Sequence, residues 1–81
     1  FIVYVFAIFE GLEVDIGMTQ DLASRVRKHN GGGVPSTRYR RPLELVYHER
    51  CATRIEARQR EKYLKSGPGH VFIMSVISTL A

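Results

Sequence analysis

Three polar side chains in this sequence have spacings that could bring them into one cleft. On a helical wheel Arg25 and His29 are about 40° apart, so both point to the same side of an expected helix. Glu61 falls on the apolar face of a second expected helix, between Ala57 and Leu64. Burying an unpaired carboxylate is expensive. We therefore expect the Glu61 side chain to meet a cation or a metal ion.

Tyr4 would add a phenol to this set from an apolar run near the start of the sequence. A carboxylate, a guanidinium, an imidazole and a phenol are the groups that phosphodiester hydrolysis needs. The carboxylate can bind a divalent ion that polarises the phosphate and carries the leaving oxygen. The guanidinium can bind non-bridging oxygens as charge builds, and the phenol or imidazole can position or deprotonate water. Because Glu61 is the one obvious inward-facing acid, we expect a single metal ion.

Glu61 and Arg25 also have purely structural interpretations. Glu61 could form a surface salt bridge with Arg58 or Lys65, which lie three residues before it and four after it, as most helical acids do. Arg25 could pair with Asp21 one helical turn earlier. Their surroundings in the folded chain decide between the two interpretations.

The same choice exists for the other two side chains. His29 lies near an expected helix C-terminus, where a histidine is often only a favourable partner of the helix dipole. Tyr4 lies in an apolar strand, where a tyrosine is more often a core residue whose hydroxyl needs one polar partner.

The strands that would position Tyr4 can be placed from the pattern of side chains. Residues 1–9 predict a strand buried on both faces, because β-branched and aromatic residues run almost unbroken. Alternation over residues 12–17 predicts a second strand, paired with the first in a hairpin through the turn at residues 10–11. Residues 43–47 predict a third strand.

The first helix is expected directly after the second strand. Thr19 is predicted as its N-cap, with Asp21 in the first turn, where a negative charge suits the helix dipole. The segment Asn30-Gly31 ends this helix. A loop is expected from there to residue 42.

A capping box predicts the start of the second helix. Thr53 and Glu56 are expected to satisfy each other's backbone N–H groups. The helix runs to about Lys65 and is closed by residues 66–69, which contain two glycines and a proline. The apolar tail at residues 70–81 could be a last strand or a packed helix, because its periodicity does not decide.

These elements predict an α+β fold, with a small three-stranded mixed or antiparallel sheet flanked by helices in the order β-β-α-β-α. The 81 residues, 44% hydrophobic and 25% charged, suit one soluble domain at residues 1–81. The single cysteine, Cys51, excludes a disulfide framework and a cysteine-rich zinc site, and favours a reducing compartment. The opening apolar run is too short to span a bilayer, so no membrane association is expected.

Basic residues are concentrated in the middle of the sequence. All twelve Lys and Arg residues lie from Arg25 to Lys65, against four acidic residues in the same stretch. Such a stretch suits a polyanion such as nucleic acid, although a merely soluble basic surface would have the same composition. The side chains expected to contact nucleic acid, mainly at its phosphates, are Arg38, Tyr39, Arg40, Arg41, Arg54, Arg58, Lys62 and Lys65.

Short motifs occur in a characteristic order along the sequence. They are Val3-Tyr4, Ile16-Gly17, Asp21-Leu22, His29-Asn30, Arg41-Pro42-Leu43-Glu44-Leu45-Val46-Tyr47, Arg60-Glu61-Lys62 and Leu64-Lys65-Ser66-Gly67. Through these motifs the chain resembles the GIY-YIG endonuclease superfamily, and specifically its small stand-alone branch. The resemblance covers nearly the whole sequence.

The resemblance implies a role for each matching residue. Tyr4 would orient or activate the attacking water, and Arg25 would stabilise charge at the scissile phosphate. His29 would assist proton transfer. Glu61 would be the single protein ligand of one Mg²⁺ or Mn²⁺ ion. Gly17 would be the close-packing glycine of the second motif.

Asp15 departs from the family pattern, because the second motif normally has tyrosine before Ile16-Gly17. As a carboxylate in the active site, Asp15 could add a metal ligand, or it could repel phosphate and disable cleavage. The family's late asparagine also has no counterpart in this chain.

The resemblance implies a metal-dependent DNA endonuclease that hydrolyses phosphodiester bonds through activated water, without a covalent intermediate. We expect it in the cytoplasm, associated with the nucleoid, or in the nucleus if the source is a eukaryote. The alternative is a nucleic-acid-binding module of the same fold whose cleavage Asp15 impairs. A purely structural interaction domain is the third possibility. No oligomeric state is predicted.

Overall fold

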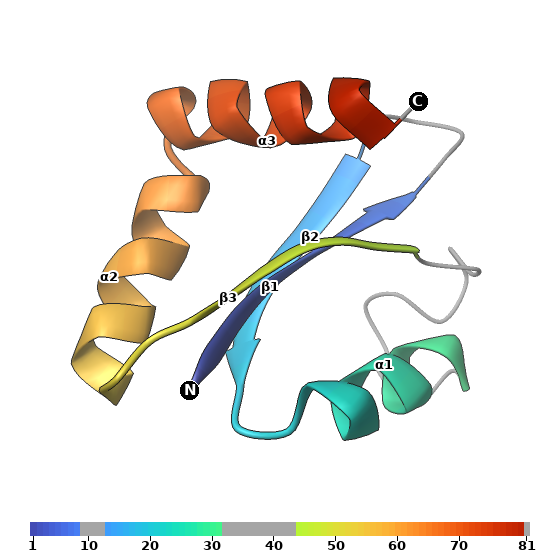
Figure 1. Cartoon of the computed structure of the whole chain (residues 1–81), viewed down its shortest axis with the longest axis vertical. Coiled ribbons are helices and arrows are strands. Elements are labelled where there is room, and N and C mark those ends of the chain that lie inside the picture. The colour runs from blue at the N-terminus through green and yellow to red at the C-terminus, as the bar shows by residue number, and fades with distance from the viewer. Residues whose placement is uncertain (9–12, 32–43, 81) are drawn as a thin grey trace.

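The computed structural model describes residues 1–8, 13–31 and 44–80. Three strands form one antiparallel sheet in which β1 is the middle strand, and three helices flank it (Figure 1). The elements in chain order are β1 (Ile2–Ile8), β2 (Glu13–Thr19), α1 (Leu22–Asn30), β3 (Glu44–Arg50), α2 (Arg54–Leu64) and α3 (Gly67–Leu80). The predicted α+β class and the order β-β-α-β-α are confirmed, with a third helix added at the end.

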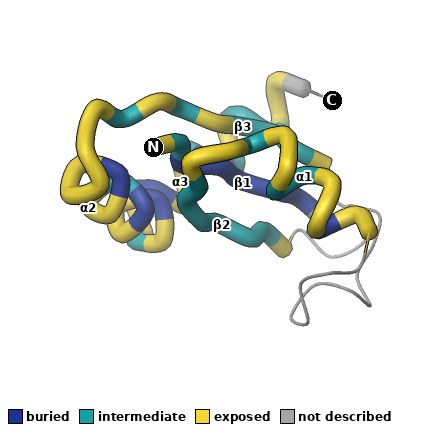
Figure 2. Tube along the Cα trace, turned by 90° about the horizontal axis from the view of Figure 1, so that it is seen from below, coloured by how far each residue is buried: buried dark blue, intermediate teal, exposed yellow. Residues whose placement is uncertain are grey.

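The middle strand β1 is buried on both faces, as its unbroken apolar sequence predicted. Residues 3–7 are all buried, and Figure 2 shows β1 as a dark stretch between two less buried strands. Successive side chains of a strand point to opposite faces. Val3 and Val5 accordingly pack with Ala57 and Leu64 of α2 and Ile73 of α3.

The other face of β1 packs against α1. Tyr4 and Phe6 form a second buried cluster with Leu22 and Val26 of this helix and Leu45 of β3. The sheet therefore lies between α1 on one face and α2 with α3 on the other. Tyr4 belongs to the α1 face.

The start of α1 differs from the prediction. Thr19 is still part of β2, where it pairs with Ile2, so it does not cap the helix. Asp21 is the N-cap, and its Oδ1 accepts a hydrogen bond from the backbone N–H of Ser24 at 3.0 Å. Strand pairing thus extends two residues beyond the predicted end and moves the cap forward. The predicted end of the helix at Asn30-Gly31 is confirmed.

The capping box of α2 is confirmed in one half. Thr53 Oγ1 accepts from the backbone N–H of Glu56 at 3.1 Å. The Glu56 carboxylate, however, accepts from the backbone N–H of Ala52 at 3.1 Å and not from that of Thr53. The helix ends at Leu64, with Lys65 as its C-cap. β3 runs to Arg50, three residues beyond its predicted end.

The apolar tail is a helix. α3 begins at Gly67, so residues 66–69 are the junction and first turn of α3 and not only the close of α2. Pro68 is tolerated there, because a first-turn residue needs no N–H for helix hydrogen bonds. Within the described parts of the chain, no helix combines the length and apolar character needed to cross a membrane.

A polar network fixes α2 against β3. Arg60 Nε donates to Glu49 Oε1 at 2.5 Å, and the Tyr47 hydroxyl donates to the other oxygen of Glu49 at 2.6 Å. The Arg60 guanidinium also lies over the rings of Tyr63 and Phe72, at 4.8 and 5.8 Å from their centroids. The network therefore ties α2, the helix that contains Glu61, to β3.

The glycine pair at the α2–α3 junction gives a test of this packing. A Cβ at Gly69 would lie 2.5 Å from Leu64 Cα and 2.7 Å from the carbonyl carbon of Tyr63, whereas a Cβ at Gly67 meets nothing within 4 Å. Backbone atoms cannot move aside cheaply. Gly69→Ala should therefore lower the free energy of unfolding by about 1–3 kcal/mol in urea denaturation. Gly67→Ala is the control and should change it by less than about 0.5 kcal/mol; equal losses would contradict the close approach.

Candidate active site

Tyr4 and Arg25 form the centre of the site. Arg25 Nε, from α1, donates a hydrogen bond to the Tyr4 hydroxyl at 2.9 Å. Tyr4 is 1% exposed and pairs with Gly17 across the sheet. A Cβ at residue 17 would lie 2.7 Å from Tyr4 Cζ, so the phenol packs directly on the Gly17 backbone. Gly17 therefore has the close-packing position that the resemblance implied.

The guanidinium of Arg25 faces Tyr4 and not Asp21. The Asp21 carboxylate is engaged in capping α1. The sequence left open an ion pair between Arg25 and Asp21, one helical turn apart. In the structure Arg25 instead contacts Tyr4 of the middle strand. This contact brings a cation to the hydroxyl of a buried phenol.

His29 is buried in the same cluster and points inward from the last turn of α1. It is fully buried, with its ring centroid 4.6 Å from that of Phe6 and 6.0 Å from that of Tyr4. Its Nε2 lies 3.7 Å from Oδ2 of Asp15 on β2. Burial lowers the pKa of His29 below its ordinary value of 6.5; Asp15 opposes this shift. The imidazole is therefore neutral at pH 7.

The Tyr4 hydroxyl is affected by both carboxylates of the site. Burial raises the pKa of Tyr4, the hydrogen bond and charge of Arg25 lower it, and the charges of Asp15 and Glu61 raise it further. The net direction is upward, so the phenol keeps its proton at neutral pH. The charges that act on this hydroxyl therefore come from β2 and α2 as well as from α1.

Glu61 is buried on the inward face of α2, as predicted, and is 8% exposed. Its Oε2 accepts from Lys65 Nζ at 2.9 Å, and its Oε1 lies 3.6 Å from Arg58 Nη1. Both salt-bridge partners of the structural interpretation are therefore present, but the carboxylate is not a solvated surface group. Among the described residues, the buried Oε1 has no hydrogen-bond partner.

The Glu61 carboxylate fits a hydrated divalent ion. Residues 1–8, 13–31 and 44–80 contain no group of three or more His, Cys, Asp or Glu side chains that could hold a metal ion. Mg²⁺ does not require such a group, since it keeps several waters and binds through one or two carboxylates together with phosphate oxygens. A buried carboxylate oxygen without a hydrogen bond is a suitable ligand for an ion of this kind.

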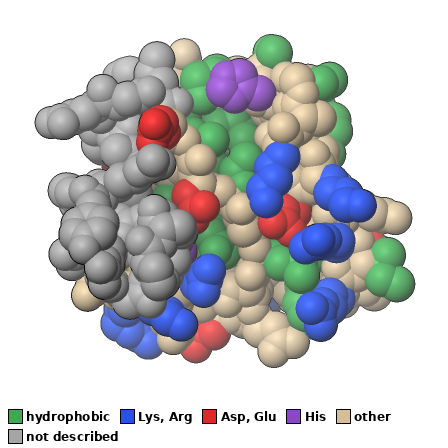
Figure 3. Space-filling model, turned by 180° about the vertical axis from the view of Figure 1, so that it is seen from behind, with side chains coloured by type: hydrophobic (Ala, Val, Ile, Leu, Met, Phe, Trp, Pro, Cys, Tyr) green, Lys and Arg blue, Asp and Glu red, His purple; other side chains and the backbone are tan. Residues whose placement is uncertain are grey.

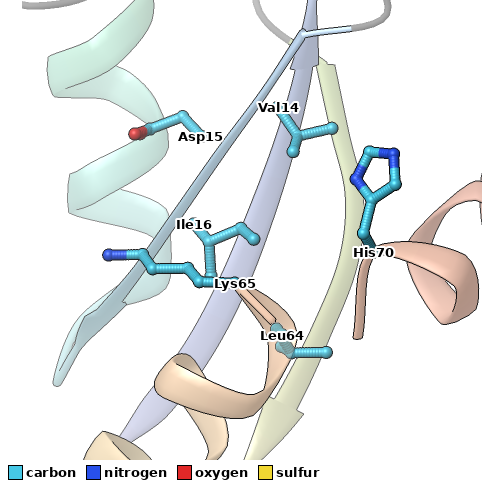
Figure 4. Close-up of a pocket in the computed structure, with 6 residues that line it drawn as sticks. All are labelled: Val14, Asp15, Ile16, Leu64, Lys65 and His70. Atoms are coloured by element: carbon cyan, nitrogen blue, oxygen red, sulfur yellow. The ribbon is translucent and has the colours of Figure 1, made fainter. Parts of the chain in front are cut away.

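An open hollow lies beside these groups, between β2 and the junction of α2 with α3. Figure 4 shows Asp15 and Lys65 extending their charged ends to the same side of this hollow, with His70 on the opposite side. Its lining residues are Val14, Asp15, Ile16, Leu64, Lys65 and His70. The hollow gives solvent access to the part of the site that contains Asp15.

Cationic side chains gather on the face that contains α2. Figure 3 shows Lys and Arg side chains clustered there, with acidic side chains among them. A second hollow at the end of β2 is lined by Met18, Arg54, Ile55, Arg58, Gln59 and Lys62. Arg38, Tyr39, Arg40 and Arg41, the other residues predicted to contact nucleic acid, lie outside the described residues.

Comparison with known proteins identifies the family. Residues 1–68 match the family model described as the GIY-YIG catalytic domain. The chain belongs to the GIY-YIG family. Its relatives include UPF0213 proteins, a small stand-alone branch of the family. No solved structure matches the chain.

Three UPF0213 relatives show the extent of the similarity. The chain is 51% identical to the UPF0213 protein of Bacillus pumilus over 51 residues, which is 62% of this chain and 52% of the relative. It is 48% identical to UPF0213 protein YazA of Bacillus subtilis over 50 residues, 60% of this chain and 50% of the relative. A Staphylococcus epidermidis relative is 47% identical over 51 residues, 62% of each protein. The chain thus spans about half to three-fifths of the length of these relatives.

Residues from several of the GIY-YIG motifs meet at Tyr4 on the middle strand. Tyr4 contacts both Gly17 and Arg25, and the charges of Asp15 and Glu61 act on its hydroxyl. The sequence did not predict the proximity of Asp15 and His29. A signal for the burial of His29 was present, because it continues the apolar stripe of α1 formed by Leu22 and Val26.

The buried imidazole predicts a pH dependence of stability. Because the pKa of His29 is lowered in the folded state, the unfolded chain binds more protons below about pH 6.5. The stability that the neutral imidazole contributes is present above that pH and is lost as the pH falls toward the folded pKa. The free energy of unfolding, measured in urea from pH 7 to pH 5, should therefore decrease.

His29→Gln should reduce this slope, whatever its effect on stability at pH 7. The control is His70→Gln, which removes an exposed imidazole from α3. If His29→Gln leaves the slope unchanged, the imidazole is not held neutral by the fold.

Proposed function

We propose that this domain is a DNA endonuclease that depends on a divalent metal ion and hydrolyses phosphodiester bonds through activated water. The observation that carries the proposal is the buried Glu61 carboxylate, whose charge acts on the Tyr4 hydroxyl that Arg25 binds. Membership of the GIY-YIG family supports a nuclease. A single ion, Mg²⁺ or Mn²⁺, held by Glu61 is part of the proposal.

Arg25 is the group proposed to meet the scissile phosphate. Its Nε is used in the bond to Tyr4, so its terminal amino groups are the ones that would face non-bridging oxygens. The bond to a buried phenol holds the guanidinium in one place before substrate arrives. Such preorganisation lets a cation stabilise developing charge without first having to move.

Tyr4 would position water and not deprotonate it. Its raised pKa keeps the phenol protonated at neutral pH, and a protonated phenol is a poor base. When bound at Glu61, the ion would polarise the phosphate and neutralise charge on the leaving oxygen. Lys65 already binds Oε2 of Glu61, so Oε1 is the oxygen proposed as the ligand.

The cations of α2 are proposed to bind the DNA backbone. Arg54, Arg58 and Lys62 lie on α2 and Lys65 is its C-cap; they would be joined by Arg38, Tyr39, Arg40 and Arg41. Contacts of this kind give affinity but little sequence selectivity. We therefore propose that the protein prefers particular DNA structures or DNA ends. We place its activity in the cytoplasm at the nucleoid, or in the nucleus if the source is a eukaryote.

A second candidate is a binding module that has lost cleavage. The observation that favours it is the partly exposed Asp15 carboxylate, whose charge acts on the Tyr4 hydroxyl. A negative charge at this place could repel the phosphate. A binding module of this kind would bind DNA but would not cleave it.

A nicking assay on supercoiled plasmid with Mg²⁺ or Mn²⁺ separates the two. The parent protein should nick the plasmid, and EDTA should stop the nicking. Glu61→Gln should lower the nicking rate about 10²-fold or more, because one major electrostatic contribution to the transition state is removed. Glu44→Gln, an exposed carboxylate on β3, is the control. A parent protein that binds DNA and never nicks would support the binding module.

The salt dependence of DNA binding tests the cation set. Lys62 is exposed on α2, so Lys62→Ala should leave thermal stability nearly unchanged. Loss of one phosphate contact should reduce the slope of log Kobs against log salt concentration by about 1. Lys62→Arg retains the charge and should retain the slope. If both variants keep the parent slope in fluorescence anisotropy, Lys62 does not contact phosphate.

A further inference from the structure

The reaction proposed above leaves one proton without a destination. A water molecule that attacks phosphorus must lose a proton, and Tyr4 is badly suited to accept it because its phenol is buried and protonated. Lys65 and Arg25 are cations and cannot accept a proton. The acceptor must therefore be another group that reaches the open part of the site.

Asp15 has the required position. Its side chain is 36% exposed, and it lines the hollow that opens between β2 and α2. On the inner side its Oδ2 lies 3.7 Å from Nε2 of the fully buried His29. Asp15 thus connects the solvent side of the site with a buried imidazole.

Phe6 keeps the two groups together. It pairs with Asp15 in the register of β1 and β2, and its ring lies 4.6 Å from that of His29. The imidazole is therefore packed beneath the strand position of Asp15. Such packing reduces the freedom that a carboxylate and an imidazole would otherwise lose on pairing.

We propose that Asp15 accepts the proton of the attacking water and that His29, behind it, receives that proton from Asp15. The pair would replace the tyrosine that the second GIY-YIG motif has at this position. This inference rests on the proposed nuclease function. Asp15 would be a catalytic residue, and His29 a positioning residue that acts through Asp15.

The step conserves atoms and charge. Asp15 takes one proton as the water oxygen forms its bond to phosphorus and the bond from phosphorus to the leaving oxygen breaks. The leaving oxygen is protonated by solvent water. The proton on Asp15 passes to the neutral His29 ring, and His29 later returns it to solvent through Asp15, so both groups return to their starting forms.

Several charged or titratable groups face this pair. Lys65, the C-cap of α2, and His70 of α3 line the same hollow as Asp15, and the charge of Asp15 acts on Tyr4 of β1. Arg25 and Lys28 act on His29 from its own helix. Arg25 and Lys28 lower the pKa of His29, and Asp15 raises it. Removing the Asp15 charge should therefore change the titration of His29, which gives a measurement that does not depend on cleavage.

Asp15→Asn is the central variant, because it keeps the shape of the side chain and removes its ability to accept a proton. Single-turnover nicking of supercoiled plasmid with Mn²⁺, measured from pH 5 to pH 9, should be about 10²-fold or more slower than in the parent protein. The affinity for DNA should be equal to that of the parent protein or higher. The acidic limb of the pH profile should disappear. His29→Gln should slow cleavage less and shift that limb, whereas a merely structural role would leave it in place.

The outcomes are distinguishable from failure of the proposed function. If the parent protein cleaves and Asp15→Asn cleaves equally fast with the same pH profile, the inference is overturned and the nuclease stands. If Asp15→Tyr is faster than the parent, the carboxylate is a defect and the inference is also overturned. A parent protein that cleaves no DNA would overturn both.

NMR titration of the His29 ring provides the second measurement. Asp15→Asn should lower the pKa of His29 below its value in the parent protein, because an opposing negative charge is lost. Glu44→Gln on β3 should leave the His29 titration unchanged. An unchanged pKa in Asp15→Asn would show that the two groups are not coupled and would overturn the relay.

Discussion

The close approach of the Tyr4 ring to the backbone of Gly17 is the constraint on which the site depends. β1 is the middle strand, and the Tyr4 ring lies where its β2 neighbour has no side chain, because a Cβ at residue 17 would clash with it. With the ring in this position, the hydroxyl accepts a hydrogen bond from Arg25, which holds the guanidinium beside the ring. α2 covers the opposite face, yet the charge of Glu61 still acts on this hydroxyl.

Much of the fold follows from local sequence, whereas the misplaced cap of α1 arises from pairing between residues that are distant in sequence. The unbroken apolar run of β1 and the Thr53 cap of α2 were both predicted correctly, because each depends on neighbouring residues. The cap of α1 was placed wrongly, because Thr19 is held in β2 by pairing with Ile2, a residue distant in sequence. The tail stayed undecided for a different reason: α3 carries no charged side chain that would mark its exposed face.

From the sequence, only those features of the site that depend on a single helix could be predicted. Helical spacing correctly predicted that Glu61 faces inward from α2 and that Arg25 and His29 share the side of α1 that faces the sheet. Spacing within a helix could not predict the contacts between different helices and strands. The position of Asp15 beside His29 depends on how α1 lies against β2, and that depends on the packing of large side chains such as Phe6.

Local charge explains how the proposed site can contain two carboxylates and still suit a phosphate. Asp15 and Glu61 are negative, but Lys65 and Arg58 are paired with Glu61 and Arg25 lies at Tyr4. Among these described groups the cations outnumber the anions even before any divalent ion is added. Replacing a phenol by a carboxylate therefore leaves a positive site, and the new charge lies beside His29, a neutral ring that can take up a proton. The loss of tyrosine at residue 15 is thus compatible with phosphate binding, because the surrounding helices supply the compensating charge.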